Sequence, residues 1–238
     1  MSYSVENLKF AYDQTQVLGG ISFDLQEKEI FCILGPSGCG KTTLLKLLAG
    51  ILKPESGLID VFFNKEKSFL FQEPRLLPGM TVYENLVFTT KAHLDEKTLK
   101  EQIEYYLKEV RLWEYRDYYP DELSGGMQQR IAIVRAFLFP SELMLLDEPF
   151  KSLDIEIMLS VMETFRTLWH VHGRTVIMIT HDVLAAALLG DRIMILSEKP
   201  TKTTALLANP VPNEMRQIQH VEIGKFQSEL YGYLCGVK

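Results

Sequence analysis

The stretch Gly35–Thr43 holds the residues whose types and spacing are best suited to chemistry. It matches the pattern G-x-x-x-x-G-K-[ST] of the phosphate-binding P-loop. Glycines let backbone amides turn inward around an anion, and a following helix adds the positive end of its dipole. Lys41 should then reach the β- and γ-phosphates, and the Thr42 hydroxyl should ligate Mg²⁺. We therefore predict a nucleoside triphosphate site formed by Gly35, Pro36, Ser37, Gly38, Cys39, Gly40, Lys41, Thr42 and Thr43.

Two carboxylates follow a short apolar run later in the chain. Asp147 and Glu148 come directly after Leu143–Leu146, whose length and composition predict a buried strand. Ligands of α/β sheets bind at the carboxyl ends of such strands. Asp147 could hold Mg²⁺, directly or through water, and Glu148 could act as general base on the attacking water. His181 follows the predicted strand Thr175–Thr180, where it could contact a γ-phosphate or be a purely structural histidine.

The elements that must position these groups follow from hydrophobic periodicity. Strands are predicted at Leu8–Tyr12, Ile21–Leu25, Glu29–Leu34, Leu58–Phe63, Ser68–Phe71, Leu143–Glu148, Thr175–Thr180, Arg192–Leu196 and Thr203–Leu207. Helices are predicted at Lys41–Ala49, Met127–Phe139, Ile155–Trp169, Val183–Leu189 and His220–Leu234, with a helical pattern throughout Thr81–Leu138. The first two strands should be antiparallel, and Ser124 is placed to cap the helix after it. This order predicts an α/β lobe made from both ends of the chain, with a helical insertion at about residues 80–138.

The composition excludes several classes of protein. The 238 residues are 47% hydrophobic and 24% charged, which is ordinary for a globular protein. The formal net charge of -6 argues against a general nucleic-acid binder. The three cysteines form no C-x-x-C pair and no disulfide framework, which favours a reducing cytoplasm, and we interpret Cys39 as a small filler rather than a redox switch. We expect neither a secretory signal at the N-terminus nor a membrane-spanning segment.

The stretch Leu123–Arg130, with the sequence LSGGMQQR, resembles the signature motif of ATP-binding cassette (ABC) ATPases. The remaining motifs of that family then correspond by position. Gly35–Thr43 resembles the Walker A loop, Gln72 the Q-loop glutamine, Leu143–Glu148 the Walker B strand with its catalytic glutamate, Ser152-Leu153-Asp154 the D-loop, and His181 the switch histidine. Tyr12 resembles the aromatic residue that stacks on adenine, although periodicity alone fits a half-buried strand aromatic equally well.

The resemblance spans roughly residues 1–200 and implies a fold and a site. The expected fold class is α/β, a P-loop NTPase of the ABC ATPase type with an antiparallel β subdomain and an inserted α-helical subdomain. The expected parts are a nucleotide-binding α/β lobe at 1–79 and 139–208, a helical signature subdomain at 80–138 and a C-terminal tail helix at 209–238. The implied catalytic residues are Glu148, His181, Gln72 and Lys41, and the implied Mg²⁺ ligands are Thr42, Gln72 and Asp147. The implied nucleotide-binding residues beyond the P-loop are Tyr12, Ser124, Gly125, Gly126 and Asp154.

The same resemblance implies ATP and Mg²⁺ as cofactors and a mechanism that needs two cassettes. A homodimer would sandwich two ATP molecules, each between the Walker A loop of one cassette and Ser124–Gly126 of the other. Closure would drive integral-membrane permease subunits. The chain would be peripheral at the cytoplasmic face of the cell membrane, an extracytoplasmic solute-binding protein would act through the permease, and no nucleic acid would be bound.

The stretch Phe71–Pro78 is similar to bacterial importers of nitrate, sulfonates, taurine and pyrimidine precursors. The chain departs from them at Lys151, where they usually have Gly, at Asp121, where many have His, and at Gly79, which replaces a common Trp. The stretch Phe63–Ser68 is also shorter than usual. None of these changes touches a hydrolytic group, but they leave the substrate open. The alternatives are a soluble ABC ATPase of the DNA-repair or translation type and an exporter cassette whose membrane domain is a separate chain.

Overall fold

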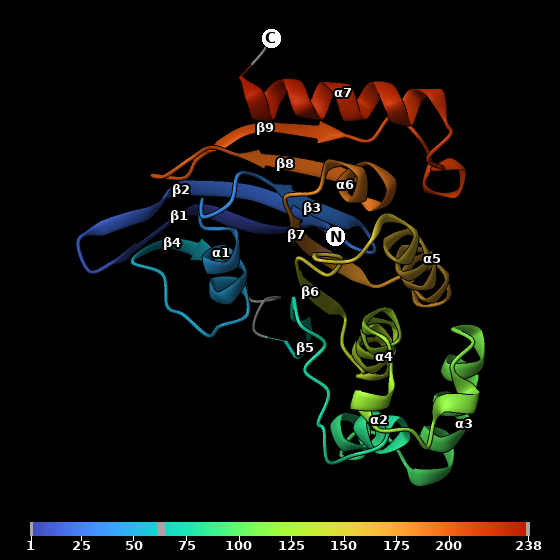
Figure 1. Cartoon of the computed structure of the whole chain (residues 1–238). Helices are drawn as coiled ribbons and strands as arrows, with labels where there is room; N and C mark the ends of the chain where they lie inside the picture. The colour runs from blue at the N-terminus through green and yellow to red at the C-terminus, as the bar shows by residue number, and fades with distance from the viewer. Residues whose placement is uncertain (1, 61–64, 237–238) are drawn as a thin grey trace.

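The computed structural model describes residues 2–60 and 65–236, which form two sheets covered by helices (Figure 1). A three-stranded sheet has the order β2-β1-β4, and a six-stranded sheet has the order β5-β6-β7-β3-β8-β9. The strands are β1 (Ser2–Tyr12), β2 (Thr15–Gln26), β3 (Ile30–Leu34), β4 (Ser56–Ile59), β5 (Lys67–Leu70), β6 (Leu143–Asp147), β7 (Thr175–Thr180), β8 (Arg192–Leu196) and β9 (Thr203–Ala208). The helices are α1 (Lys41–Leu48), α2 (Val82–Thr90), α3 (Glu96–Glu109), α4 (Gly125–Leu138), α5 (Ile155–His172), α6 (Val183–Leu189) and α7 (Val221–Cys235).

The smaller sheet is antiparallel, as its alternating apolar residues predict. β1 pairs with β2 and with β4, and a turn at Asp13 and Gln14 joins β1 to β2. The strand predicted at Leu58–Phe63 differs: β4 begins at Ser56 and ends at Ile59, while residues 61–63 lie outside the described residues. The short connection noted at Phe63–Ser68 lies partly outside them as well.

The six-stranded sheet is parallel except for β9, which pairs antiparallel with β8 at one edge. β3, which precedes the P-loop, lies between β7 and β8, and all five of its residues are buried. Its side chains alternate between two cores: Ile30, Cys32 and Leu34 pack on the helical side, whereas Phe31 and Ile33 pack on the side of α1 and the small sheet. Burial on both faces explains the continuous apolar run of this strand.

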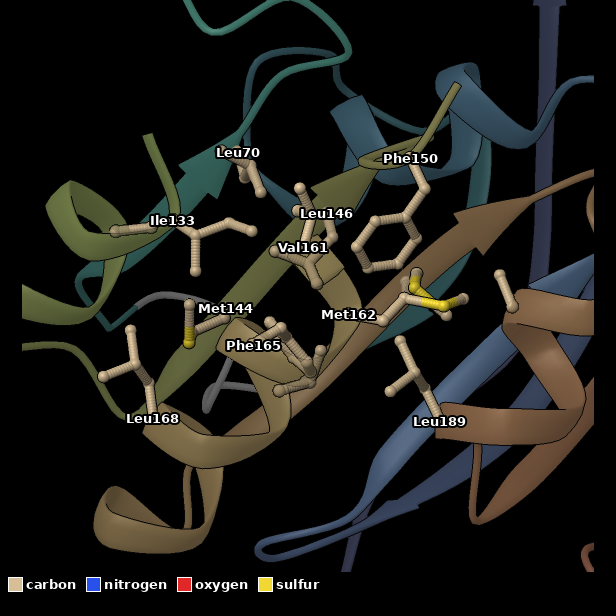
Figure 2. Close-up of a cluster of buried hydrophobic side chains, with 14 of the residues drawn as sticks. Leu70, Ile133, Met144, Leu146, Phe150, Val161, Met162, Phe165, Leu168 and Leu189 are labelled. Carbon is tan, nitrogen blue, oxygen red and sulfur yellow. The ribbon is translucent and has the colours of Figure 1, made fainter. Parts of the chain in front are cut away.

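The helical side of the sheet forms one continuous core with the region at 82–138. Figure 2 shows side chains of β5, β6, α4, α5 and α6 meeting in this core. Those labelled are Leu70, Ile133, Met144, Leu146, Phe150, Val161, Met162, Phe165, Leu168 and Leu189. The same core contains Leu86 of α2 and Ile103 of α3. The helical region therefore shares its packing with the sheet instead of having a core of its own.

The helical pattern predicted throughout Thr81–Leu138 is divided in the structure. α2 begins with a capping box in which Thr81 and Glu84 exchange hydrogen bonds, and Asp95 caps α3 through the Thr98 amide. Short 3₁₀ turns at Trp113–Tyr115 and Pro120–Glu122 precede α4. The helix predicted to start at Met127 starts two residues earlier, at Gly125, and Ser124 caps it as expected.

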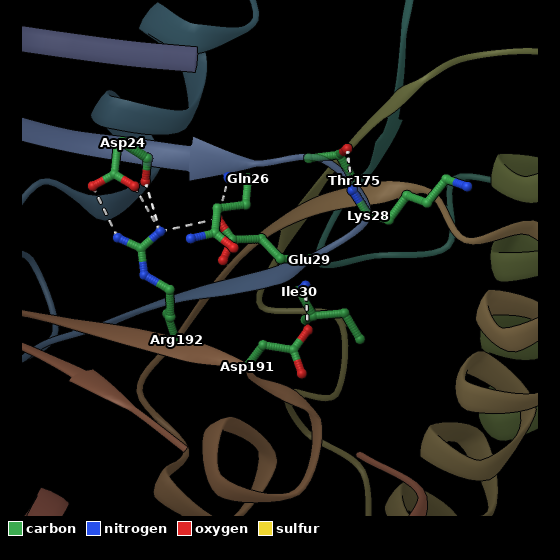
Figure 3. Close-up of polar contacts among 8 residues, drawn as sticks. All are labelled: Asp24, Gln26, Lys28, Glu29, Ile30, Thr175, Asp191 and Arg192. Atoms are coloured by element: carbon green, nitrogen blue, oxygen red, sulfur yellow. Dashed lines mark hydrogen bonds and ion pairs between the residues drawn. The ribbon is translucent and has the colours of Figure 1, made fainter. Parts of the chain in front are cut away.

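A group of polar contacts joins the two sheets at the end of β3 away from the P-loop (Figure 3). Arg192 of β8 forms ion pairs with Asp24 (2.9 Å) and Glu29 (3.3 Å). Asp191 Oδ2 accepts a hydrogen bond from the Ile30 amide (2.8 Å). Burial raises the pKa of Glu29, and the nearby Arg192 opposes that shift. These contacts fix the start of β3 and so help to place the loop at its other end.

The C-terminal segment is anchored to the sheet lobe. Arg216, which is buried, donates to the backbone oxygens of Val211 (2.8 Å) and Leu189 (3.0 Å) and pairs with Asp191 (2.8 Å). α7 packs on α6, and Figure 1 shows it along the β9 edge of the molecule. Among the helices of residues 2–60 and 65–236, none is long and apolar enough to cross a membrane.

Candidate functional site

The P-loop leads from β3 into α1 and folds around the Lys41 side chain. Lys41 is 4% exposed, and its Nζ donates hydrogen bonds to the backbone oxygens of Gly35 (2.8 Å) and Pro36 (2.9 Å). Gly40 has a φ of 111°, and a Cβ there would lie 2.7 Å from Val17 Cγ1, so this position requires glycine. Gly40 caps α1 without a side-chain hydrogen bond, which leaves the first helical amides available to an anion. The loop thus offers a cation and backbone donors to a polyphosphate.

The three residues predicted to ligate Mg²⁺ line one cavity. Thr42 Oγ1 donates a hydrogen bond to Asp147 Oδ1 (3.2 Å), and Gln72 lies with them on the wall of a cavity of about 440 Å³. Burial raises the pKa of Asp147, and the hydrogen bond from Thr42 opposes this. A cation beside this carboxylate would offset the cost of burying its charge.

The donor set at this cavity fits Mg²⁺. A hydroxyl, a carboxylate and an amide oxygen are hard oxygen ligands, and Mg²⁺ usually takes one or two protein carboxylates together with phosphate oxygens and water. Within the described parts of the chain, no cluster of three or more His, Cys, Asp or Glu could hold a metal.

Glu148 turns out of the sheet immediately after β6. Its φ is 45°, and its amide donates to the backbone oxygen of Ile179 in β7 (3.0 Å). Its Oε2 lies 2.8 Å from His181 Nδ1 and 3.4 Å from Lys151 Nζ. The Glu148 side chain is 12% exposed, whereas that of His181 is 44% exposed. The neighbouring strands β6 and β7 thus bring these two predicted catalytic residues together, and a role for His181 at the γ-phosphate stays a prediction.

Tyr12 is exposed at the end of β1. It is 46% exposed, and its ring makes an edge contact with Phe10 at 4.8 Å between centroids. An exposure of 46% fits both the half-buried strand aromatic that periodicity allowed and a ring available to a planar ligand, so stacking of Tyr12 on adenine stays a prediction.

Tyr12→Ala should weaken ATP binding by about 1–3 kcal/mol, the usual contribution of one base stacked on an aromatic ring. This corresponds to a rise in Kd of roughly 5- to 150-fold. Isothermal titration with a non-hydrolysable ATP analogue measures it. Tyr231→Ala, which removes an exposed ring from α7, is the matched control. An unchanged Kd in Tyr12→Ala would show that the ring does not contact the base.

The signature residues lie at the start of α4. The Ser124 side chain accepts a hydrogen bond from the Met127 amide (3.3 Å). Gly126 packs so closely on α5 that a Cβ would lie 2.5 Å from Ile157 Cγ2. In the described part of the chain, no hydrogen bond or ion pair joins Ser124–Gly126 to the P-loop. The exposed Asp154 caps α5 without a side-chain hydrogen bond. Contacts of these residues with nucleotide stay predictions.

Sequence reasoning missed two polar side chains of α4 that contact the site loops. Gln129 is buried and donates to the backbone oxygen of Pro149 (2.5 Å), directly after Glu148. Arg135 donates to the backbone oxygens of Pro74 and Arg75, beyond Gln72. Polar residues within an otherwise apolar helix were the available signal for both.

A P-loop between a buried strand and a helix, with carboxylates at the end of a neighbouring parallel strand, defines a P-loop nucleoside triphosphatase. A family model described as ABC transporter matches residues 18–151, which is more than half of the chain. The chain therefore belongs to the ABC transporter family, and it is an ATP-binding, ATP-hydrolysing subunit of that family. The α/β fold with an antiparallel sheet and an inserted helical region is confirmed.

Several known proteins are similar to this chain over most of its length. An aliphatic sulfonates import ATP-binding protein, SsuB of Bacillus cereus, is 39% identical over 83% of this chain and 80% of its own length. SsuB of Granulibacter bethesdensis is 37% identical over 99% of this chain and 94% of its own. The spermidine/putrescine import protein PotA of Acetivibrio thermocellus is 36% identical over 81% of this chain and 58% of its own. The solved structure of cbiO1 from Clostridium perfringens, part of the ABC transporter complex cbiONQ, matches with a TM-score of 0.78 and 28% identity, covering 87% of this chain and 88% of that one.

Proposed function

We propose that this chain is the ATP-hydrolysing subunit of a bacterial importer of a small solute. The observation that supports ATP hydrolysis is the cavity where Thr42, Gln72 and Asp147 meet beside the P-loop. The relatives at 36–39% identity are named as import ATP-binding proteins, which supports the direction of transport. Those names include different solutes, and a cassette holds no solute site, so the solute is selected by the permease and a solute-binding protein.

The site residues divide the work of hydrolysis. On ATP binding, Lys41 exchanges its contacts with the Gly35 and Pro36 carbonyls for the β- and γ-phosphates. Thr42, Gln72 and Asp147 would hold Mg²⁺, which would neutralise charge on the phosphate oxygens. Glu148 takes the proton of the attacking water, and His181, beside it, orients the carboxylate and the γ-phosphate.

We further propose that two copies of the chain close around ATP. Ser124 and the amides of Gly125 and Gly126, at the N-terminus of α4, would bind the γ-phosphate held by the partner's P-loop. The open surface at Gly125, where a Cβ would meet nothing within 4 Å, leaves room for that approach. Asp154 would lie at the same interface. In this arrangement residues 80–138 act as the helical signature subdomain, 1–79 and 139–208 as the nucleotide lobe, and 209–238 as a C-terminal tail.

The permease would dock beside the loop that carries Gln72, at the inner face of the membrane. Past Gln72, the apolar side chains of Leu76, Leu77, Met80 and Tyr83 are half-buried, and Leu76 and Tyr83 pack partly on the helical core. They are less exposed than an open apolar loop would be. Three tyrosines add to the exposed apolar surface of this loop: Tyr115, Tyr118 and Tyr119 are 37–45% exposed. The backbone oxygen of Tyr118 accepts a hydrogen bond from the Val82 amide, which places this tyrosine segment beside α2. A short helix of the permease could pack there.

Leu77→Asp and Tyr83→Asp should abolish co-purification with the permease, because a charge at a docked apolar surface is costly to desolvate. The Kd for ATP of the isolated subunit should stay within twofold of wild type. The measurement is affinity purification of the tagged chain from detergent-solubilised membranes, with identification of the membrane proteins retained. Leu206→Asp, at an exposed leucine of β9, is the control and should retain the permease. Thermal unfolding of each variant checks that it remains folded.

Normal assembly of both variants would place the docking site elsewhere. Retention of ribosomes or DNA in place of a multi-spanning membrane protein would support the soluble ABC ATPase alternative and contradict the transporter proposal. A multi-spanning partner that moves solute outward in reconstituted vesicles would support the exporter alternative.

A further inference from the structure

The Gln72 loop is tied to α4 by one side chain. Arg135, in the last turn of α4, donates from Nη1 to the backbone oxygen of Arg75 (2.9 Å) and from Nη2 to that of Pro74 (2.7 Å). The planar guanidinium thus serves two consecutive carbonyls of the loop between β5 and α2. These carbonyls lie two and three residues beyond Gln72.

Arg135 contacts the loop through hydrogen bonds to neutral backbone carbonyls. Burial lowers the pKa of its guanidinium. In the described parts of the chain, no carboxylate lies within ion-pair distance of it, so the two carbonyls are the partners of its forked end. Arg135 is partly buried, and its two hydrogen bonds hold consecutive carbonyls of the loop in one place relative to α4.

The loop itself has a defined shape around Gln72. Arg75 has a φ of 47°, in the left-handed region, and its guanidinium lies 3.8 Å from the centroid of the Phe71 ring. The contact of Phe71 with Arg75 therefore joins the two ends of the segment that contains Gln72 and Glu73, both of which line the cavity shared with Thr42 and Asp147. With Arg135 holding the carbonyls behind it, the loop is fixed on two sides.

α4 connects this contact to the signature residues. Ser124 caps the N-terminus of α4 and Arg135 lies eleven residues later, about 16 Å along the axis at 1.5 Å per residue. The helix has no break between them and packs on α5, α2 and β5. A displacement of its N-terminus therefore moves Arg135 as part of the same rigid element.

We propose that Arg135 is a positioning residue that couples α4 to the site: it sets the place of Gln72 in the Thr42–Asp147 cavity according to the position of the signature helix. The proposal rests on the proposed role of Gln72 as an Mg²⁺ ligand. It would make hydrolysis sensitive to the helix that meets the second cassette in the proposed dimer.

The first test measures the loop without nucleotide. Arg135→Met keeps most of the side-chain length and removes the donors, so hydrogen–deuterium exchange of a peptide covering residues 71–77 should become at least fivefold faster. A peptide covering β3 should exchange at the wild-type rate. Arg130→Met is the matched control, because Arg130 Nε donates within its own helix, to the Gly126 oxygen (3.5 Å), and this variant should leave the 71–77 peptide unchanged. Unchanged exchange of that peptide in Arg135→Met would overturn the proposal.

The second test is a double-mutant cycle with Gln72→Ala. Arg135→Met should lower kcat about tenfold, with the Kd for ATP within twofold of wild type. In the Gln72→Ala background it should lower kcat less than twofold, because a side chain that acts through Gln72 has nothing left to position. An equal fall in kcat in both backgrounds would overturn the inference about Arg135 and leave the proposed role of Gln72 standing. An unchanged kcat in Gln72→Ala by itself would instead overturn the proposed role of Gln72.

Milder variants keep the test decisive if Arg135→Met does not fold. Arg135→Lys can serve one carbonyl but not both, so it should give an intermediate exchange rate and an intermediate kcat. Phe71→Leu removes the ring under Arg75 and should loosen the same peptide while leaving Arg135 in place. Exchange at the wild-type rate in both of these variants would also contradict the proposal.

Discussion

Glu148→Gln should leave ATP bound and almost unhydrolysed. The amide is isosteric with the carboxylate but cannot accept the proton of the attacking water, and general-base catalysis is worth about 10²–10⁴ in rate. The expected loss in kcat corresponds to about 3–5 kcal/mol in the activation barrier. Steady-state phosphate release measures kcat, and titration with ATP measures Kd, which should stay within about threefold of wild type.

The control for this variant is Glu222→Gln, which makes the same change at an exposed carboxylate of α7 and should hydrolyse ATP normally. The Glu148 carboxylate contacts His181 and Lys151 in the structure, so the amide also loses the ion pair with Lys151 and changes the contact with His181. Thermal unfolding separates that structural effect from the chemical one. A kcat within threefold of wild type would exclude Glu148 as the base.

Lys41→Ala should remove most of the affinity for ATP, or most of its turnover. The lysine is buried beneath the loop, so a polyphosphate in the cradle would lose the one cation that the loop itself supplies. We expect the Kd for ATP to rise by at least tenfold, about 1.4 kcal/mol or more. Isothermal titration calorimetry measures this affinity directly.

Lys53→Ala, at an exposed lysine after α1, is the matched control and should bind ATP as wild type does. Thermal unfolding of Lys41→Ala checks that the fold tolerates the loss of the contacts with the Gly35 and Pro36 carbonyls. Normal binding and hydrolysis in Lys41→Ala would contradict the assignment of the P-loop.

The features that sequence reasoning predicted well are those encoded locally. Short stretches of sequence predict the P-loop and the strands β3, β6 and β7. The glycines mark the loop, and the continuous apolar runs mark strands that are buried on both faces. The Ser124 cap and the Gly173 end of α5 belong to the same kind of signal. These segments carry most of the candidate site.

Features that depend on long-range packing could not be predicted in this way. The order β5-β6-β7-β3-β8-β9 comes from pairing between strands far apart in sequence. Lys151 contacts Glu148 where the Glu148 backbone is left-handed, and Arg135 meets the Pro74 carbonyl across 61 residues. Asp95, which divides the helical region into α2 and α3, was a local cap signal that the apolar periodicity obscured.

The central claim is that ATP closes two of these chains around their signature residues. Its most direct test is the mass of Glu148→Gln in solution, measured by light scattering during gel filtration with ATP and Mg²⁺. The chain is 27.3 kDa, and we predict about twice that mass with ATP, the single mass without it, and the single mass again when Ser124→Arg is added to block closure. A monomer at ATP concentrations that saturate the site, or a dimer that persists without ATP and with Ser124→Arg, would contradict the account.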